Sequence, residues 1–263
     1  MRAPNETATT VLITGASSGL GYELAMHYAR AGATVHALAR RVRALEDLAE
    51  ASRRSGVPGR VVPAVVDVTD AEALAAEIEV AHRAAGGALD LVIANAGVYA
   101  AGPVARMDWR TVKHVLDVNT TAACVTIAAA LPAMVARGSG TVVAISSLAG
   151  FRGHPGRAAY SASKAALRYF MEGVRAEVTG TGLRVITVFP GIVKTEMAAG
   201  FEGADMMASA TAARLIAKGI ARGEAEIAFP LPLATRARLT GALPRWIYEP
   251  LVSLRRGLRR HKP

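Results

Sequence analysis

The sequence of 263 residues predicts an α/β fold: one domain built on a doubly wound parallel sheet with helices on both faces. Short runs of aliphatic and β-branched residues alternate with longer segments of helical periodicity, which is typical of parallel strands joined by crossover helices. Hydrophobic residues make up 52% of the chain and aromatic residues only 5%, so Ala, Val and Leu supply the core. A chain of this length can bury a sizeable core.

The first strand is predicted at residues 11–14, and a glycine-rich turn joins it to a helix over residues 20–31. The turn has the spacing Gly-x-x-x-Gly-x-Gly, which differs from the commonest dinucleotide motif, and no Lys-Ser or Lys-Thr follows it as in a nucleoside triphosphate loop. Free N–H groups and the positive helix end would attract a pyrophosphate. The cofactor-binding residues expected here are Gly15, Ser17, Ser18, Gly19, Leu20 and Gly21.

The second strand is predicted at residues 34–38, and Arg40 and Arg41 follow it. In dinucleotide folds an acid at this point binds the ribose hydroxyls, whereas an arginine accommodates a 2′-phosphate. The two arginines could simply open the next helix, predicted over residues 42–55. Because cations at a helix start oppose its dipole, a bound anion explains them better. The sequence therefore favours NADP(H) over NAD(H).

The third and fourth strands are predicted at residues 61–66 and 89–94. Asp67, directly after the third strand, could accept a hydrogen bond from an adenine amino group, although turn formation alone would also explain an aspartate there. The cofactor-binding residues expected after these two strands are Asp67, Val68, Asn95, Ala96 and Gly97.

Two aspartates, Asp70 and Asp108, precede helical segments and are predicted N-caps. The uncharged run 118–136 is nearly long enough to span a bilayer. It contains Asn119, three threonines and Pro132, which predicts a buried helix instead. A buried Asn119 amide would need hydrogen-bond partners.

The last strands are predicted at residues 141–145, 183–189 and 226–229, with helices over residues 158–178 and 211–222. Tyr160 and Lys164 lie four residues apart near the start of the first of these helices, so their side chains share one face. A nearby ammonium favours the phenolate and would lower the pKa of Tyr160, which would make the phenol a usable general acid and base.

The residues of interest all follow strands directly. Gly15, Arg40, Asp67, Asn95, Ser147 and Pro190 each mark the carboxyl end of a predicted strand. Open α/β sheets bind their ligands at this edge. The common placement predicts one site there.

The formal net charge of +10 is concentrated in the C-terminal tail. Residues 236–263 hold eight Lys and Arg and one acid, a net of +7, which leaves +3 for the first 235 residues. We expect a dinucleotide-binding catalytic domain over residues 1–230 and a basic, apolar extension over residues 231–263 that packs on or beside it. The tail has few aromatic residues, which argues against sequence-specific nucleic-acid binding. It could cover the substrate pocket or a subunit seam, which we favour, or make weak contact with an anionic membrane.

The single cysteine, Cys124, lies in an apolar helical run and is expected to be a buried, inert thiol. A chain with one cysteine and no recognisable signal peptide is expected to be cytoplasmic, with a peripheral membrane location as the alternative. The histidines show no metal-ligand spacing, so no metal site is predicted.

In combination, these motifs make the chain resemble a short-chain dehydrogenase/reductase of the single-domain, Rossmann-like branch, over roughly residues 10–229. The matching residues follow the family order: the turn from Thr14 to Gly21, Asp67, Asn95-Ala96-Gly97, Asn119, Ser147, Tyr160 with Lys164, and Pro190-Gly191 with Thr195.

The resemblance implies a catalytic set of Asn119, Ser147, Tyr160 and Lys164. Tyr160 would exchange the proton with the substrate oxygen, and Ser147, 13 residues before it as in the family, would hydrogen-bond that oxygen. Lys164 would hold the nicotinamide ribose and Asn119 would anchor a water. The cofactor residues would further include Tyr160 itself, Pro190, Gly191, Val193 and Thr195, the last two beside the carboxamide.

The substrate is expected to be a small, hydrophobic carbonyl compound or alcohol, because the predicted lid at residues 194–210, Leu148 and Phe151 are mostly apolar. We expect His154 to be a solvent-exposed loop residue and Trp109 and Trp246 to be packing residues. The resulting hypothesis is an NADP(H)-dependent alcohol dehydrogenase or ketone reductase, as a homodimer or homotetramer. The alternative is a catalytically silent, cofactor-sensing protein of the same fold.

Overall fold

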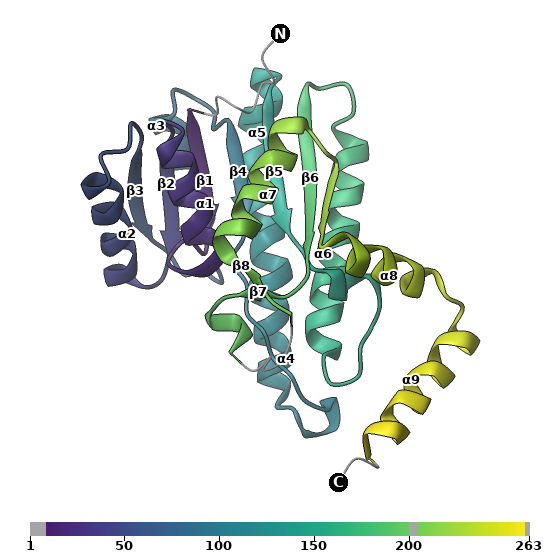
Figure 1. Cartoon of the computed structure of the whole chain (residues 1–263). Coiled ribbons are helices and arrows are strands. Elements are labelled where there is room, and N and C mark those ends of the chain that lie inside the picture. Colours follow the sequence, from purple (N-terminus) through teal and green to yellow (C-terminus); the bar gives the residue numbers. More distant parts are fainter. Residues whose placement is uncertain (1–8, 200–204, 261–263) are drawn as a thin grey trace.

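The computed structural model describes residues 9–199 and 205–260 and contains a seven-stranded, entirely parallel sheet (Figure 1). Its order is β3-β2-β1-β4-β5-β6-β9. The strands are β1 (Thr10–Thr14), β2 (Thr34–Ala39), β3 (Arg60–Val65), β4 (Leu91–Ala94), β5 (Gly140–Ile145), β6 (Leu183–Pro190) and β9 (Glu226–Phe229). The strand order reverses direction between β1 and β4, so the predicted doubly wound sheet is confirmed.

Helices cover both faces of the sheet and bury two separate apolar clusters. One cluster joins the sheet to α1 (Gly19–Arg30), α2 (Val42–Arg54) and α7 (Ser209–Arg222). The other joins it to α3 (Ala71–Ala84), α5 (Ala122–Arg137) and α6 (Ala158–Glu177). Because both faces are covered, the central strands are apolar on both sides, as β4 shows with four buried residues.

The predicted helix caps are confirmed by their hydrogen bonds. The Asp70 carboxylate accepts from the backbone N–H of Ala73 at 2.9 Å, and the Asp108 carboxylate accepts from that of Arg110 at 2.9 Å. Asp108 precedes α4 (Trp109–Leu116). Each cap satisfies an N–H group that has no partner within its own helix.

The stretch Trp109–Arg137 is helical throughout, and it is long and apolar enough to cross a membrane by length and composition alone. A five-residue π-helix, Asp117–Thr121, separates α4 from α5. In α5, Ile127, Ala130 and Met134 are fully buried against the sheet and α3. This face is part of the core, as expected for the run 118–136. Burial also raises the pKa of the Cys124 thiol to about 11, in agreement with an inert thiol.

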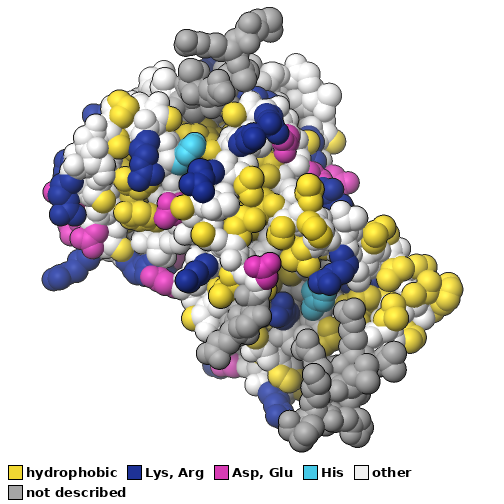
Figure 2. Space-filling model, in the orientation of Figure 1, with side chains coloured by type: hydrophobic (Ala, Val, Ile, Leu, Met, Phe, Trp, Pro, Cys, Tyr) yellow, Lys and Arg dark blue, Asp and Glu magenta, His cyan; other side chains and the backbone are white. Residues whose placement is uncertain are grey.

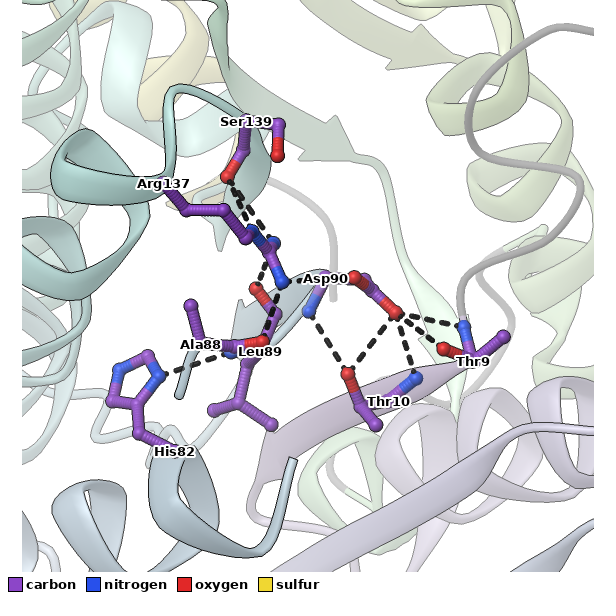
Figure 3. Close-up of polar contacts among 8 residues, drawn as sticks. All are labelled: Thr9, Thr10, His82, Ala88, Leu89, Asp90, Arg137 and Ser139. Atoms are coloured by element: carbon purple, nitrogen blue, oxygen red, sulfur yellow. Dashed lines mark hydrogen bonds and ion pairs between the residues drawn. The ribbon is translucent and has the colours of Figure 1, made fainter. Parts of the chain in front are cut away.

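Polar contacts close the end of the sheet opposite the carboxyl ends of the strands (Figure 3). One Asp90 carboxylate oxygen accepts hydrogen bonds from the backbone N–H and hydroxyl groups of Thr9 and Thr10, at 2.8 to 3.0 Å. Arg137, the last residue of α5, lies 3.2 Å from the other oxygen and donates to the carbonyls of Ala88 and Leu89. These contacts fix the start of β1 and the end of α5 to the loop before β4.

The chain after β6 forms a small separate layer with β7 (Val193–Lys194), a 3₁₀ turn (Glu196–Ala198) and β8 (Met207–Ala208). The lid expected at residues 194–210 falls partly on residues 200–204, outside the described residues, so its mobility stays a prediction.

Two C-terminal helices follow β9: α8 (Leu231–Ala242) and α9 (Arg245–Arg260). Ala234 of α8 is buried against Leu148 and Phe189, and α9 packs against the loop after β5, where the Tyr248 hydroxyl donates to the Gly153 carbonyl at 2.6 Å. Pro250 lies inside α9, although a proline usually ends or kinks a helix. A proline removes one backbone donor, and a carbonyl on an exposed helix can bond water instead. The division at residue 230 stays a prediction.

The expectation that both tryptophans are packing residues is wrong, because most of each side chain is exposed. Trp109 is 63% exposed and Trp246 is 76% exposed. Trp109 begins α4 and stacks on the Arg110 guanidinium, and Trp246 lies in the first turn of α9. Both occupy helix starts at the periphery, where the local sequence does not reveal which face meets the body.

Candidate active site

A cavity of about 1090 Å³ runs along the carboxyl ends of the strands. The structure brings nearly all the predicted site residues to its wall. They are Gly15, Ser17, Ser18, Gly19, Leu20, Gly21, Arg40, Arg41, Asp67, Val68, Asn95, Ala96, Gly97, Ser147, Tyr160, Lys164, Pro190, Gly191, Val193 and Thr195. Asn119 is the exception, since it is fully buried behind the wall.

The glycine turn between β1 and α1 approaches other backbone too closely for side chains. Gly15 has a φ of +69°, and a Cβ there would lie 2.7 Å from Cα of Ala96. A Cβ on Gly21 would lie 2.3 Å from the Gly15 carbonyl oxygen. The spacing of the glycines therefore follows from the way the turn packs under the loop after β4.

Asn95 holds this turn in place with its side chain. Its amide donates to the carbonyls of Thr14 at 3.0 Å and Gly15 at 3.2 Å. In return, the Thr14 hydroxyl accepts from the backbone N–H groups of Asn95 and Ala96. The role of Thr14 was missed, because a threonine inside an apolar strand gives no sign of its partner.

The two arginines after β2 lie in polar surroundings at the cavity mouth. Arg40 lies 3.6 Å from the Asp67 carboxylate. Arg41 donates to the hydroxyls of Ser17 at 3.2 Å and Ser18 at 2.5 Å, and it pairs with Glu196 at 2.9 Å. Both guanidinium groups are about half exposed. They therefore stand beside the start of α1 with solvent access.

Tyr160 and Ser147 meet at the centre of the cavity wall. Burial raises the pKa of the Tyr160 phenol, and a hydrogen bond with the Ser147 side chain opposes the shift. Ser147 also caps the turn after β5 by accepting from the N–H of Ala149 at 3.1 Å. Its neighbour Ser146 points into the protein and donates to the Lys164 carbonyl at 2.9 Å. The side-chain directions thus agree with the choice of Ser147 over Ser146.

Lys164 is 4% exposed and donates from Nζ to the carbonyl of Ile145 at 2.8 Å. Burial lowers the pKa of this ammonium to about 8. Nζ lies 6.0 Å from the centre of the Tyr160 ring. The expectation that Lys164 lowers the pKa of Tyr160 is not met in this structure, where burial dominates and raises it. Spacing placed both side chains on one face but did not show that the ammonium binds Ile145.

Asn119 lies in the π-helix, and its amide is fully used within the protein. Its Oδ1 accepts from the N–H of Val98 at 2.7 Å, and its Nδ2 donates to the Val98 carbonyl at 2.9 Å and to Ser163 at 3.0 Å. Ser163 in turn donates to the carbonyl of Tyr160 at 2.7 Å. Asn119 therefore joins the loop after β4 to the first turn of α6. Its expected contact with a water stays a prediction.

Residues 9–205 match the sequence profile of a family described as short chain dehydrogenase. The chain belongs to the short-chain dehydrogenase/reductase family. An uncharacterized oxidoreductase of Myxococcus xanthus is 46% identical over 242 residues, covering 91% of this chain and 94% of the relative. Membership makes this protein an oxidoreductase that binds a nicotinamide cofactor and acts on CH–OH or C=O groups of small molecules.

Two solved structures resemble the whole chain of this dehydrogenase. A short-chain dehydrogenase from Sphingobium yanoikuyae, in complex with NADPH, has a TM-score of 0.78 at 29% identity, covering 97% of this chain and 96% of the other. A bulky-bulky ketone specific alcohol dehydrogenase from Comamonas testosteroni has a TM-score of 0.76 at 25% identity, covering 97% and 95%.

The residues of this short-chain dehydrogenase fit a dinucleotide. At the start of α1, Ser18 makes no side-chain cap bond within the described structure, which leaves the first N–H groups of the helix to a ligand. A Cβ on Gly19 would lie 2.8 Å from the Thr195 side chain, so the loop after β6 closes directly over the turn. This arrangement can hold a pyrophosphate between the two segments.

The opposite end of the cavity contains residues that the motifs did not predict. They come from the loop after β5 and from the two C-terminal helices: Leu148, Arg152, His154, Arg157, Leu233, Arg236, Ala237, Thr240, Tyr248 and Val252. We call this the β9 end and the part near Arg40, Arg41 and Asp67 the β2 end. The expectation that His154 is solvent-exposed is wrong. It is half-buried, and burial and then Arg157 lower its pKa.

Proposed function

We propose that this protein transfers a hydride between NADP(H) and a carbonyl compound or secondary alcohol, with Tyr160 as general acid and base. The observation that carries the proposal is the meeting of Tyr160, Ser147 and Lys164 at one point of the cavity wall. A protein that only senses the cofactor has no need of such a proton-transferring group.

Each residue of this group has a role that follows from its surroundings. Because burial raises its pKa, the Tyr160 phenol holds its proton at neutral pH and can donate it to the oxygen of a carbonyl under reduction. Ser147 would donate a second hydrogen bond to that oxygen and orient it. Lys164 would bind the nicotinamide ribose and stabilise the phenolate in the reverse direction. When bound, the nicotinamide supplies or accepts the hydride.

Tyr160→Phe tests this assignment. The variant should lose activity by roughly 10²–10⁴-fold in kcat, which is the usual contribution of a positioned acid–base group. Its affinity for the cofactor, measured by fluorescence titration, should stay within a few-fold of wild type. Tyr169→Phe is the matched control, since Tyr169 is an exposed tyrosine on the same helix. Retention of more than about a third of the turnover by Tyr160→Phe would contradict the role.

The preference for NADP(H) rests on Arg40 and Arg41, which stand where a 2′-phosphate would lie. Their guanidinium groups are half exposed, and the residue after β2 is not an acid. The structural relative with bound NADPH adds support. Arginine binds phosphate through paired hydrogen bonds, and an acid at this point would repel it.

NADPH should therefore raise the thermal midpoint of the wild type more than NADH at equal concentration. Arg40→Asp should reduce or reverse this difference. Arg43→Asp makes the same change in charge three residues further on, at a position that does not line the cavity, and should leave the difference intact. Equal shifts of the thermal midpoint with both cofactors in the wild type would contradict the proposed role of Arg40 and Arg41 in binding the 2′-phosphate.

The substrate is proposed to be largely apolar, because Val98, Leu148, Leu233 and Val252 line the cavity around Tyr160. The resemblance to an enzyme specific for bulky ketones agrees with a large apolar carbonyl compound. NADPH oxidation across a panel of bulky ketones should identify active substrates, and no turnover across the panel would favour the silent alternative. We further propose a homodimer or homotetramer, which light scattering would detect.

A further inference from the structure

The two ends of the cavity differ in how their positive charges are balanced. At the β2 end, Arg40 lies beside Asp67 and Arg41 pairs with Glu196. These are the two carboxylates on the described cavity wall. The β9 end has Arg152 and Arg236 and, among its described lining residues, no carboxylate. The positive charge at this end therefore has no carboxylate opposite it on the described cavity wall.

The arrangement of α8 shows that this imbalance is local. Leu233, Arg236, Ala237 and Thr240 recur at three- and four-residue spacing, and all of them line the cavity. Arg238, two residues beyond Arg236, lies off the cavity and pairs with Glu226 at 2.9 Å. Arg245 of α9 likewise pairs with Glu249 at 2.7 Å. Of these three arginines, Arg236 faces the cavity, and it has no carboxylate partner in the described structure.

Arg152 is held in a fixed position at the same end. Its Nη1 donates to the carbonyls of Gly241 at 3.3 Å and Leu243 at 3.0 Å. Its guanidinium stacks on the Tyr248 ring, with Cζ 4.3 Å from the ring centre. Tyr248 itself donates to the Gly153 carbonyl at 2.6 Å. Both of these bonds use Nη1 of a group with five N–H donors, so the guanidinium retains donors for a further acceptor.

Cations gathered in a partly enclosed space repel one another, and a bound anion relieves that repulsion. Arginine suits carboxylate and phosphate groups in particular, because its planar fork can donate two hydrogen bonds to one such group. Apolar side chains, Leu148, Leu233 and Val252, line the same end. Figure 2 shows basic and histidine side chains beside hydrophobic ones between the body and the C-terminal helices.

We infer that the substrate carries an anionic oxygen group, a carboxylate or a phosphate, which Arg236 and Arg152 bind while its carbonyl or alcohol lies at Tyr160. The inference rests on the proposed function and narrows its substrate class, from an apolar carbonyl compound to an amphipathic one with a negative charge. The apolar wall would hold the carbon skeleton between the two groups.

Binding of unreactive probes tests this without requiring turnover. Octanoate, octyl phosphate and the neutral octan-1-ol would be titrated calorimetrically into the full-length protein with bound NADP⁺, in about 50 mM salt to limit screening. At least one anion should bind about tenfold or more tighter than the alcohol, the size expected for charge-assisted hydrogen bonds. The tighter anion identifies the group as carboxylate or phosphate. Equal binding of all three probes would overturn the inference.

Variants then locate the anion. Arg236→Gln, a change on an exposed helix face, should remove most of the difference in affinity between the anion and the alcohol. Arg152→Gln should also reduce this difference. Arg238→Gln is the matched control and should leave it unchanged. An unaltered difference in Arg236→Gln would overturn the assignment. Tyr160→Phe should still bind the anion. If the protein does not catalyse hydride transfer, turnover will be absent but the anion will still bind, so the two proposals can fail separately.

Discussion

Lys164 is a charged side chain that is buried and donates a hydrogen bond to a backbone carbonyl, that of Ile145. No carboxylate is recorded beside it in the described structure, and burial alone lowers its pKa to about 8. Because the group holds its proton less strongly in the folded chain than in water, keeping it charged at neutral pH costs stability. The cost is consistent with a residue retained for catalysis and not for folding.

Lys164→Met should therefore raise the free energy of unfolding at pH 7, by roughly 1–3 kcal/mol, while it removes activity and weakens cofactor binding. The gain should be largest below pH 8 and should shrink as the pH rises toward the ordinary lysine pKa of about 10.4, because the wild-type lysine then becomes neutral. Urea unfolding at pH 7 and pH 10 would measure the gain in stability and its decrease with pH. Lys218→Met, at an exposed position on α7, is the control and should change little.

Residue identities were more predictable than side-chain directions. The sequence predicted the positions that line the cavity because glycines, arginines and polar residues directly follow strands, and parallel strands end at one edge. It could not show that Asn119 faces Val98 and Ser163, because a π-helix alters the direction of every side chain within it. Arg152, Arg236 and Tyr248 were missed since tertiary packing alone brings them to the cavity.

At the scale of elements, the polar contacts around Asp90 hold together the end of the sheet that lies opposite the site (Figure 3). Burial raises the pKa of the Asp90 carboxyl, but the hydrogen bonds from Thr9 and Thr10 outweigh it and hold the pKa below its usual range. The carboxylate therefore stabilises the fold at pH values above the ordinary pKa of about 3.9. That stabilisation is lost as the pH falls through the lowered value.

Asp90→Asn should lower the free energy of unfolding by about 1–3 kcal/mol at pH 7, because the N–H and hydroxyl groups of Thr9 and Thr10 lose a charged acceptor. The difference from wild type should narrow below about pH 4, where the wild-type carboxylate also becomes neutral. Cofactor affinity should not change, since Asp90 lies at the far end of β4. Urea unfolding at both pH values tests this, with the exposed Asp47→Asn as control. A pH-independent difference would contradict the role of the charge.

The alternation of strands and helices was predicted to within about two residues because apolar periodicity and N-caps determine it locally. The last six residues of β6 are all buried, so its apolar run was unambiguous. Pro250 shows the limit of such local prediction. A proline in a helix on the surface costs a hydrogen bond that water can replace, so the helix can continue through it. The exposure of Trp246 could not be predicted either, because it depends on how α9 packs against the loop after β5.

At the scale of the whole molecule, two parts of the chain build the two ends of the cavity. The β2 end comes from the first 100 residues together with Glu196 from the segment after β6, whereas the loop after β5 and helices α8 and α9 provide the β9 end. The proposed cofactor-binding motifs and the proposed substrate contacts are thus separate in sequence. Residues 231–252 can change without altering the glycine turn.

Removing residues 245–263 tests which role the tail has. Tyr248 and Val252 line the cavity, so we expect kcat/KM for an active substrate to fall by about tenfold or more while NADPH binding is kept. The full chain should not float with anionic liposomes at low salt. Binding to such vesicles that disappears on truncation, with kcat/KM unchanged, would instead support the membrane contact.

The π-helix between α4 and α5 makes the length of this part of the chain critical. Deleting one residue between Leu116 and Ala122 would restore an unbroken α-helix, with better hydrogen bonding along its axis. It would also rotate everything on one side by about 100° relative to the other and turn Asn119 away from Val98 and Ser163. Shortening would therefore yield a more regular helix that no longer connects the loop after β4 to the Tyr160 helix. Point substitutions on the exposed face of this helix should be tolerated, whereas single-residue deletions in it should not.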